Sequence, residues 1–91
     1  MSDPGLPKDV AAYRETPVFT ELSVPKGLLK DHRTAEGVWG LLTVISGTLD
    51  YIIKDRPTET VSASKPAVIY PGELHRVVCD APVRFKIVFH R

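Results

Sequence analysis

Residues that break regular structure interrupt this chain so often that no long helix fits into it. Eight prolines and six glycines are spread through its 91 residues. No segment keeps apolar residues at helical spacing for the roughly eleven positions that a helix prediction needs. The stretch Lys8–Tyr13 is the one place where a single helical turn is expected. The chain must therefore be built from short strands between turns, which is typical of β-sandwiches and barrels.

The expected strands are stretches of alternating or continuous apolar residues. The segment 18–24 alternates, and the segment 38–45 is apolar on both faces, as in a strand covered on both sides. Ser46-Gly47 is expected to turn the chain into a hairpin whose second strand is 48–53. Further strands are expected at 60–63, 67–70, 76–79 and 83–89.

The composition excludes several classes of partner. Hydrophobic residues make up 43% and charged residues 25% of the chain, the usual mix of a globular protein. The net charge is only +1 and the basic residues are scattered, so nucleic acid is not an expected partner. The longest apolar stretch, Val38–Ile45, is far shorter than the ~20 residues of a membrane span, so no membrane partner is expected either.

A single cysteine, Cys79, excludes an intrachain disulfide framework and favours a reducing, cytoplasmic location. The segment 1–12 has no secretion-signal pattern and is expected to be a flexible N-terminal segment before one domain over 13–91. A domain of this size has a thin core, which favours a homodimer.

Three residues are candidate metal ligands. His32 and Glu36 lie in the turn-rich stretch before the expected strand 38–45, and His75 lies at the mouth of a later strand. Imidazole and carboxylate are ligands that borderline divalent metals prefer. In a barrel, the ends of distant strands converge, so the three side chains are expected to meet. The alternative from spacing alone is that these are solvated or hydrogen-bonded loop side chains.

The same residues carry a resemblance to the two cupin motifs. It rests on Gly27, His32, Glu36, the strand end Val44-Ile45-Ser46-Gly47 and the turn Pro71-Gly72-Glu73-Leu74-His75. The block 28–40 is similar to the small single-domain cupins of the tellurite-resistance (TehB/YeaR-like) family, and 83–89 is similar to that family's last strand. The resemblance implies an all-β fold with one domain, a cupin-type β-sandwich or barrel (a double-stranded β-helix).

The resemblance also implies roles for individual residues. His75 stands where the second motif has its metal histidine, Glu36 where the first motif has a histidine, and His32 shortly before the first motif's other histidine. Gly40 and Cys79 replace the usual glutamate and asparagine, so the four-ligand set is incomplete. His32, Glu36 and His75 would then supply three ligands to a divalent metal such as Zn, Fe, Ni or Mn.

Cys79 has two interpretations. On a regular strand His75, Val77 and Cys79 point the same way, so a thiol would share the interior with the histidine. It is then either a small buried hydrophobic residue or a ligand-binding thiol, able to bind a soft metal or react with an oxyanion.

The function implied by the resemblance is a cytoplasmic domain that binds a metal or small ligand in the response to tellurite, oxidative or nitrosative stress. Its expected partners are a small molecule or oxyanion and a second copy of the chain. Two alternatives stay open. One is a metal-dependent enzyme, oxygenase-like or hydrolase-like, that uses the His/Glu/His site. The other is a dimerisation domain whose pocket has lost its function.

Overall fold

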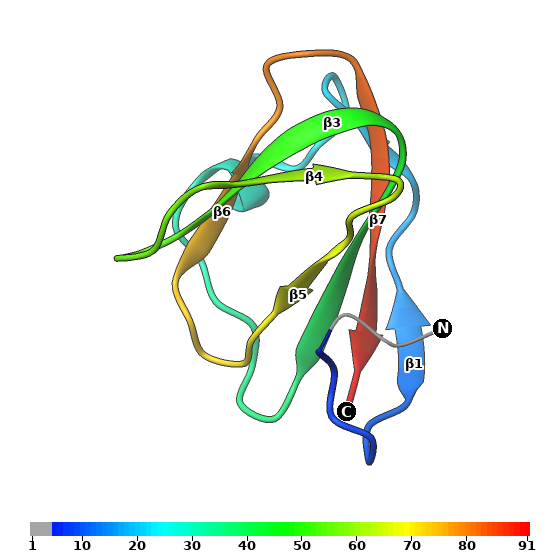
Figure 1. The fold of residues 1–91 in the computed structure, drawn as a ribbon, viewed down its shortest axis with the longest axis vertical. Coiled ribbons are helices and arrows are strands. Elements are labelled where there is room, and N and C mark those ends of the chain that lie inside the picture. The colour runs from blue at the N-terminus through cyan, green and yellow to red at the C-terminus, as the bar shows by residue number, and fades with distance from the viewer. Residues whose placement is uncertain (1–4) are drawn as a thin grey trace.

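The protein has an all-β fold, seen in a computed structural model that describes residues 5–91 (Figure 1). Its seven strands are β1 (Ala12–Glu15), β2 (Phe19–Thr20), β3 (Trp39–Ile53), β4 (Glu59–Ser62), β5 (Ala67–Ile69), β6 (His75–Val78) and β7 (Val83–His90). Within the described residues the one helix is a short 3₁₀ turn, η1 (Lys26–Leu29), and no helix there is long and apolar enough to cross a membrane.

The long strand β3 organises the sheet, and every strand pairing is antiparallel. Its first half pairs with β7 and β5, and its second half pairs with β4 and β6. The strand β7 also pairs with β1 and β2, and Figure 1 shows β1 running beside it. Over residues 5–91 the sheet is open, with β1 and β4 at the ends of its path. The prediction of an all-β fold is confirmed.

A β-bulge divides β3 into its two halves. The register shifts between Val44 and Ser46, and Gly47 follows with a φ of 77°. Before the bulge the buried positions are even-numbered, as at Val44, and after it they are odd-numbered, as at Leu49. The prediction of a hairpin turn at Ser46-Gly47 is therefore wrong. The bulge bends the strand and changes which side chains point inward, but it does not reverse the chain.

The N-terminal part also differs from the prediction. In place of a helical turn over Lys8–Tyr13, the chain makes a turn at residues 8–9 and enters β1 at Ala12. The reason is that β1 finds a hydrogen-bonding partner in the edge of β7, which local sequence does not reveal. The expected N-terminal segment 1–12 therefore contributes the first residue of a strand, and its residues 1–4 lie outside the described residues.

The expected strand over 18–24 is shortened to the two residues of β2. The chain turns directly afterwards, because the backbone N–H of Thr20 donates to Ser23 Oγ (2.8 Å) and the N–H of Ser23 donates to the Thr20 carbonyl (3.1 Å). Serine and threonine hydroxyls favour such turns by bonding to nearby backbone groups.

One hydrophobic core joins the two halves of the sheet. Its residues come from the inward faces of β3 to β7: Leu42, Val44, Leu49, Tyr51, Ile53, Val61, Ala67, Ile69, Val77, Val83, Phe85 and Ile87. Apart from the hydroxyl of Tyr51, His75 is the one buried polar side chain among the described residues, with 2% of its surface exposed. A buried imidazole in an apolar core identifies the region that needs a functional explanation.

Candidate functional site

His32 and His75 lie against each other although they are distant in sequence. The two residues form an isolated antiparallel bridge, in which each backbone N–H donates to the other's carbonyl at 2.9 Å. Their rings meet edge to face, with centroids 4.3 Å apart and planes at 70°. The sequence-based prediction placed both at one site, and the structure brings these two together.

Backbone hydrogen bonds set the orientation of both imidazoles. Nδ1 of His32 lies 2.9 Å from the Lys30 carbonyl, and Nδ1 of His75 lies 2.8 Å from the Glu73 carbonyl. A carbonyl only accepts hydrogen bonds, so each Nδ1 carries the proton and donates. In the neutral ring, Nε2 then presents its lone pair. The pair thus offers two Nε2 lone pairs held by the backbone.

The Nε2 atom of His75 is buried and has no hydrogen-bond partner among the described residues. Burial lowers the pKa of His75 below the usual histidine value, and repulsion from the neighbouring His32 ring, when that ring is protonated, lowers it further. The Glu73 carbonyl and the Asp31 carboxylate act in the opposite direction and only partly offset these effects. His75 is consequently held neutral with its lone pair unused, an unusual state for a buried polar atom.

Tyr51 completes the buried polar side of the site. Its ring centroid lies 5.6 Å from that of His75, and the residue is 1% exposed. Burial raises the pKa of the Tyr51 hydroxyl well above its ordinary value, and the carboxylates of Glu73 and Glu59 raise it further, against a smaller effect of Arg56. The phenol therefore stays protonated and is available as a hydrogen-bond donor.

Charged residues surround an opening near Tyr51 that is lined by Ile53, two positions further along β3. Arg56 makes a 3.2 Å ion pair with Glu73, and its guanidinium lies 5.6 Å from the Tyr70 ring centroid. Glu59 on β4 is the register partner of Tyr51. A cavity of about 220 Å³ at this opening is lined by Arg56, Glu59 and Lys65 together with apolar residues of β3 and β5. The opening has a polar rim of mixed charge.

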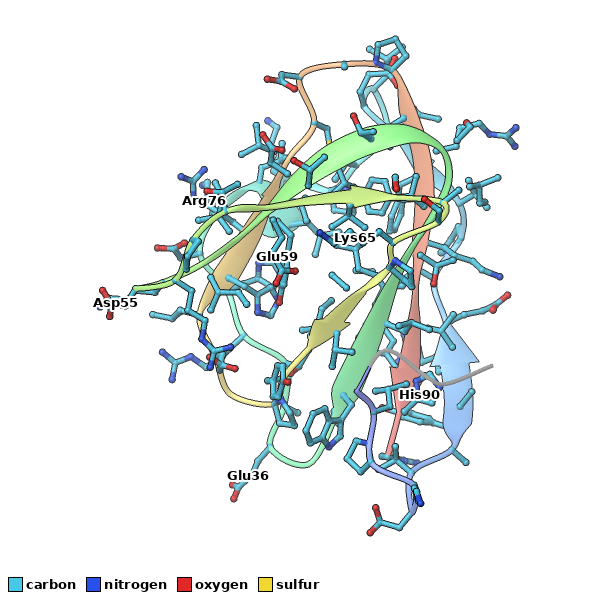
Figure 2. All side chains as sticks on the ribbon, in the orientation of Figure 1. Glu36, Asp55, Glu59, Lys65, Arg76 and His90 are labelled. Carbon is cyan, nitrogen blue, oxygen red and sulfur yellow. The ribbon has the colours of Figure 1, made fainter. Side chains whose placement is uncertain are left out.

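Glu36 does not join the two histidines. It is exposed, and Figure 2 shows it at the tip of its loop, away from Glu59 on β4. There it borders an open surface depression shared with Arg33 and Pro71. No group of three His, Cys, Asp or Glu side chains within residues 5–91 is arranged to hold a metal ion. Of the three expected ligands, the structure therefore assembles the two imidazoles alone.

Cys79 follows the end of β6 and is half-buried against the core. Burial raises the pKa of its thiol, and the negative charges of Glu21 and Asp80 raise it further. The thiol is therefore held protonated, which lowers its nucleophilicity and its affinity for metals. These surroundings favour the interpretation of Cys79 as a small packing residue.

Tyr51 and Glu59 are site residues that the sequence-based prediction missed. Tyr51 shares the buried face of Leu49 and Ile53, and Glu59 lies on the same face of β4 as Val61 but is itself exposed, so strand periodicity was the signal for both. The signal could be used only with knowledge of the bulge, because the bulge decides which side chains after Gly47 point inward. The sequence pattern predicts a hairpin turn there instead.

The buried neutral state of His75 predicts acid sensitivity. At pH values above the pKa of a histidine in an unfolded chain, about 6.5, His75 is neutral in both the folded and the unfolded protein. As the pH falls through 6.5, the unfolded chain takes up a proton that folded His75 resists. The free energy of unfolding should then fall by up to about 1.4 kcal/mol per pH unit. Urea denaturation at a series of pH values measures this slope.

The variant His75→Asn keeps a side-chain donor to the Glu73 carbonyl but has no titratable ring. It should lose the His75 contribution to the slope, while His90→Asn should retain it. An identical slope in wild type and His75→Asn would show that the buried imidazole does not control the acid response.

Comparisons with known proteins identify relatives of this fold. The model of the TehB-like domain family matches residues 14–87. A structural-genomics crystal structure of an Escherichia coli K12 protein has a TM-score of 0.87 at 21% identity, covering 96% of this chain and 95% of that one. No curated protein matches this chain.

The crystal structure of TehB from Haemophilus influenzae has a TM-score of 0.83 at 23% identity, over 91% of this chain and 32% of TehB. This chain thus spans about a third of TehB. At such identities the two structures show a shared fold, whereas the family match covers most of the chain. The chain belongs to the TehB-like domain family.

Proposed function

We propose that this domain binds a divalent transition-metal ion through Nε2 of His32 and His75. The observation that carries the proposal is the buried Nε2 of His75, which lacks a partner within residues 5–91 and lies beside a second imidazole. A buried acceptor without a partner costs about 1–3 kcal/mol of stability, so a bound ion would offset that cost. Imidazole nitrogens suit Zn, Fe and Ni.

The hydrogen bonds around the two rings fit this role. Metal-binding histidines generally donate their second ring N–H to a carbonyl or carboxylate, which fixes the ring and makes the ligand more basic. Lys30 and Glu73 provide such carbonyls through their backbones. The low pKa of His75 supports the same role, because a ligating imidazole has to be neutral.

Two protein ligands leave coordination positions for water or a small molecule. Such a site fits a module that captures or senses a metal or a small ligand bound to it. Membership of the TehB-like family supports a link to tellurite resistance and to related oxidative or nitrosative stress. The chain spans about a third of TehB. The proposal is therefore limited to this association and assigns no activity of full-length TehB to the chain.

The proposal includes a cupin-type fold, supported by antiparallel strands that share one hydrophobic core and by the buried position of His75. A cytoplasmic location and a homodimer remain part of the proposal, supported by the single cysteine and the small core.

Isothermal titration of the apoprotein with Zn²⁺, Ni²⁺ and Co²⁺ tests the metal proposal. We expect one ion per chain, and we expect His32→Ala and His75→Ala each to weaken binding by at least about 100-fold, more than loss of an outer-shell partner does. Binding should also weaken in acid, because protons compete for Nε2.

His90 provides a matched control, since the chain has three histidines and this third one lies on β7 with its Nδ1 3.2 Å from a carbonyl in the same way. His90→Ala should bind metal as wild type does. Glu36→Gln tests whether the loop carboxylate joins as a third ligand when metal is present. Failure of the wild type to bind any of the three ions stoichiometrically would contradict the proposal.

A further inference from the structure

A second cavity of about 290 Å³, open to solvent, lies between β1 and the loop that precedes β3. Its lining includes Tyr13, Arg14, His32, Arg33, Val38 and Phe89. It shares His32 with the imidazole pair and is distinct from the smaller opening near Tyr51, which has other lining residues. Its volume is just below the ~300–1,000 Å³ of typical ligand pockets, so only a small molecule would fit.

The strand register directs Arg14 toward this cavity. Arg14 is paired with Phe89, and side chains opposite each other in an antiparallel pair point to the same face. Phe89 packs partly against the core, and Arg14, exposed like the rest of β1, lines the same cavity at the sheet edge. The neighbouring Glu15 points to the other face, where it pairs with Lys86 at 3.1 Å.

The two arginines of this cavity have no carboxylate partner. Neither Arg14 nor Arg33 forms an ion pair within the part of the chain that the structure describes. Of the nearby acidic side chains, Glu15 pairs with Lys86 and Asp31 lies 3.8 Å from Arg76, whereas Glu36 lines the neighbouring depression together with Arg33. Two arginines without an ion pair in the described part of the chain therefore line one cavity, and guanidinium groups bind carboxylates in a bidentate manner.

The rest of the lining is apolar or aromatic apart from the polar side chains of His32 and Thr34. Val38 and Phe89 are partly buried, and the Tyr13 ring is 42% exposed, with the Arg91 guanidinium over one face at 4.1 Å from its centroid and the other face left for a ligand. An inorganic anion would use the arginines but leave these surfaces without contact. A ligand with a carboxylate at one end and a ring or branched alkyl group at the other would use both.

We propose that this cavity binds a small organic carboxylate with an aromatic or branched apolar body. The carboxylate pairs with Arg14 and Arg33, and the apolar body lies against Tyr13, Val38 and Phe89. The site goes beyond the metal proposal and does not depend on it, because its recognition groups are the arginines and the apolar wall.

Phenylacetate and its uncharged analogue phenylacetamide are the probes that test this inference. Titrations are followed by amide chemical shifts of the ¹⁵N-labelled protein in the presence of a chelator, so that any metal site is empty. We expect phenylacetate to bind with shifts at residues 13, 14, 33 and 89. We also expect Arg14→Gln and Arg33→Gln each to weaken binding about tenfold, and added salt to weaken it as well.

Arg84→Gln is the matched control, since Arg84 is an exposed arginine of β7 that does not line the cavity. It should leave the affinity for phenylacetate unchanged. The inference is overturned if phenylacetate does not bind, if phenylacetamide binds equally well, or if Arg84→Gln weakens binding as much as the cavity variants. Each outcome is independent of the metal titrations, which do not involve Arg14 or Arg33.

Discussion

Replacing Phe85 with alanine is expected to lower the free energy of unfolding by about 3–5 kcal/mol. Phe85 has no exposed surface, and its ring packs against Phe19 with centroids 5.7 Å apart. In β7 it is the register partner of Phe19 on one side and Val44 on the other. Alanine would leave a cavity where these strands meet. Domains are stable by only about 5–15 kcal/mol in total, so this loss is a large fraction.

Urea denaturation followed by circular dichroism measures the effect. The conservative variant Phe85→Leu should lose less than about 1.5 kcal/mol if the core repacks around it. Ile45→Ala, on a residue with 44% of its surface exposed, should change stability by about 0.5 kcal/mol or less. If Phe85→Ala proved as stable as Ile45→Ala, Phe85 could not be buried in the core of the protein in solution.

Gly47→Ala is expected to have the second-largest effect, a loss of about 3 kcal/mol. Gly47 has a φ of 77°, where a side chain costs about 1–2 kcal/mol. A Cβ at this position would also collide with the Pro82 carbonyl oxygen and lie 3.0 Å from the Cα of Val83. Both neighbours are backbone of the adjacent chain segment, so the collision can be relieved only by moving the β3–β7 pairing.

Gly72→Ala separates the two contributions to this loss. Gly72 has nearly the same φ, 76°, but no atom lies within 4 Å of the position that a Cβ would take. Its alanine variant should therefore lose only the conformational part, about 1–2 kcal/mol. Equal losses at the two glycines, measured by urea denaturation, would contradict the close approach of Gly47 to β7.

The Gly47 bulge also matters for the site. It changes the phase of β3, so that Leu49, Tyr51 and Ile53 point inward after it. Without that change Tyr51 would lie on the outer face and could not pack beside His75. A weakened bulge should therefore alter the surroundings of the histidine pair as well as the stability.

Much of the fold was predictable because strand periodicity is a local property. The apolar positions 83, 85, 87 and 89 of the last strand alternate with polar ones, and Val83, Phe85 and Ile87 are buried in β7 as this pattern indicates. The turn at Ser46-Gly47 was not predictable in the same way. A glycine with positive φ serves a hairpin and a bulge equally well, and only the pairing with distant strands selects between them.

The site was predicted in part for the same reason. The parity of His75 with Val77 indicates an inward side chain, and the structure places it there beside His32. Glu36 lies in a loop, where no periodicity constrains direction, and its side chain faces solvent. Arg14 was not identified as a candidate site residue from the sequence, because its position beside Phe89 depends on how β1 pairs with β7.

The amino-acid sequence by itself determined the strand-based class, the inward faces of most strands and the identity of the two histidines. These follow from the alternation of side chains along a strand and from residue chemistry, both of which act over a few neighbouring positions. Tertiary structure alone decided which imidazoles meet, which carboxylate stays apart and which arginines lack a partner. Those outcomes depend on the pairing of strands that are distant in the sequence. Their hydrogen bonds and their burial form together when the chain folds, so no short stretch of sequence determines them.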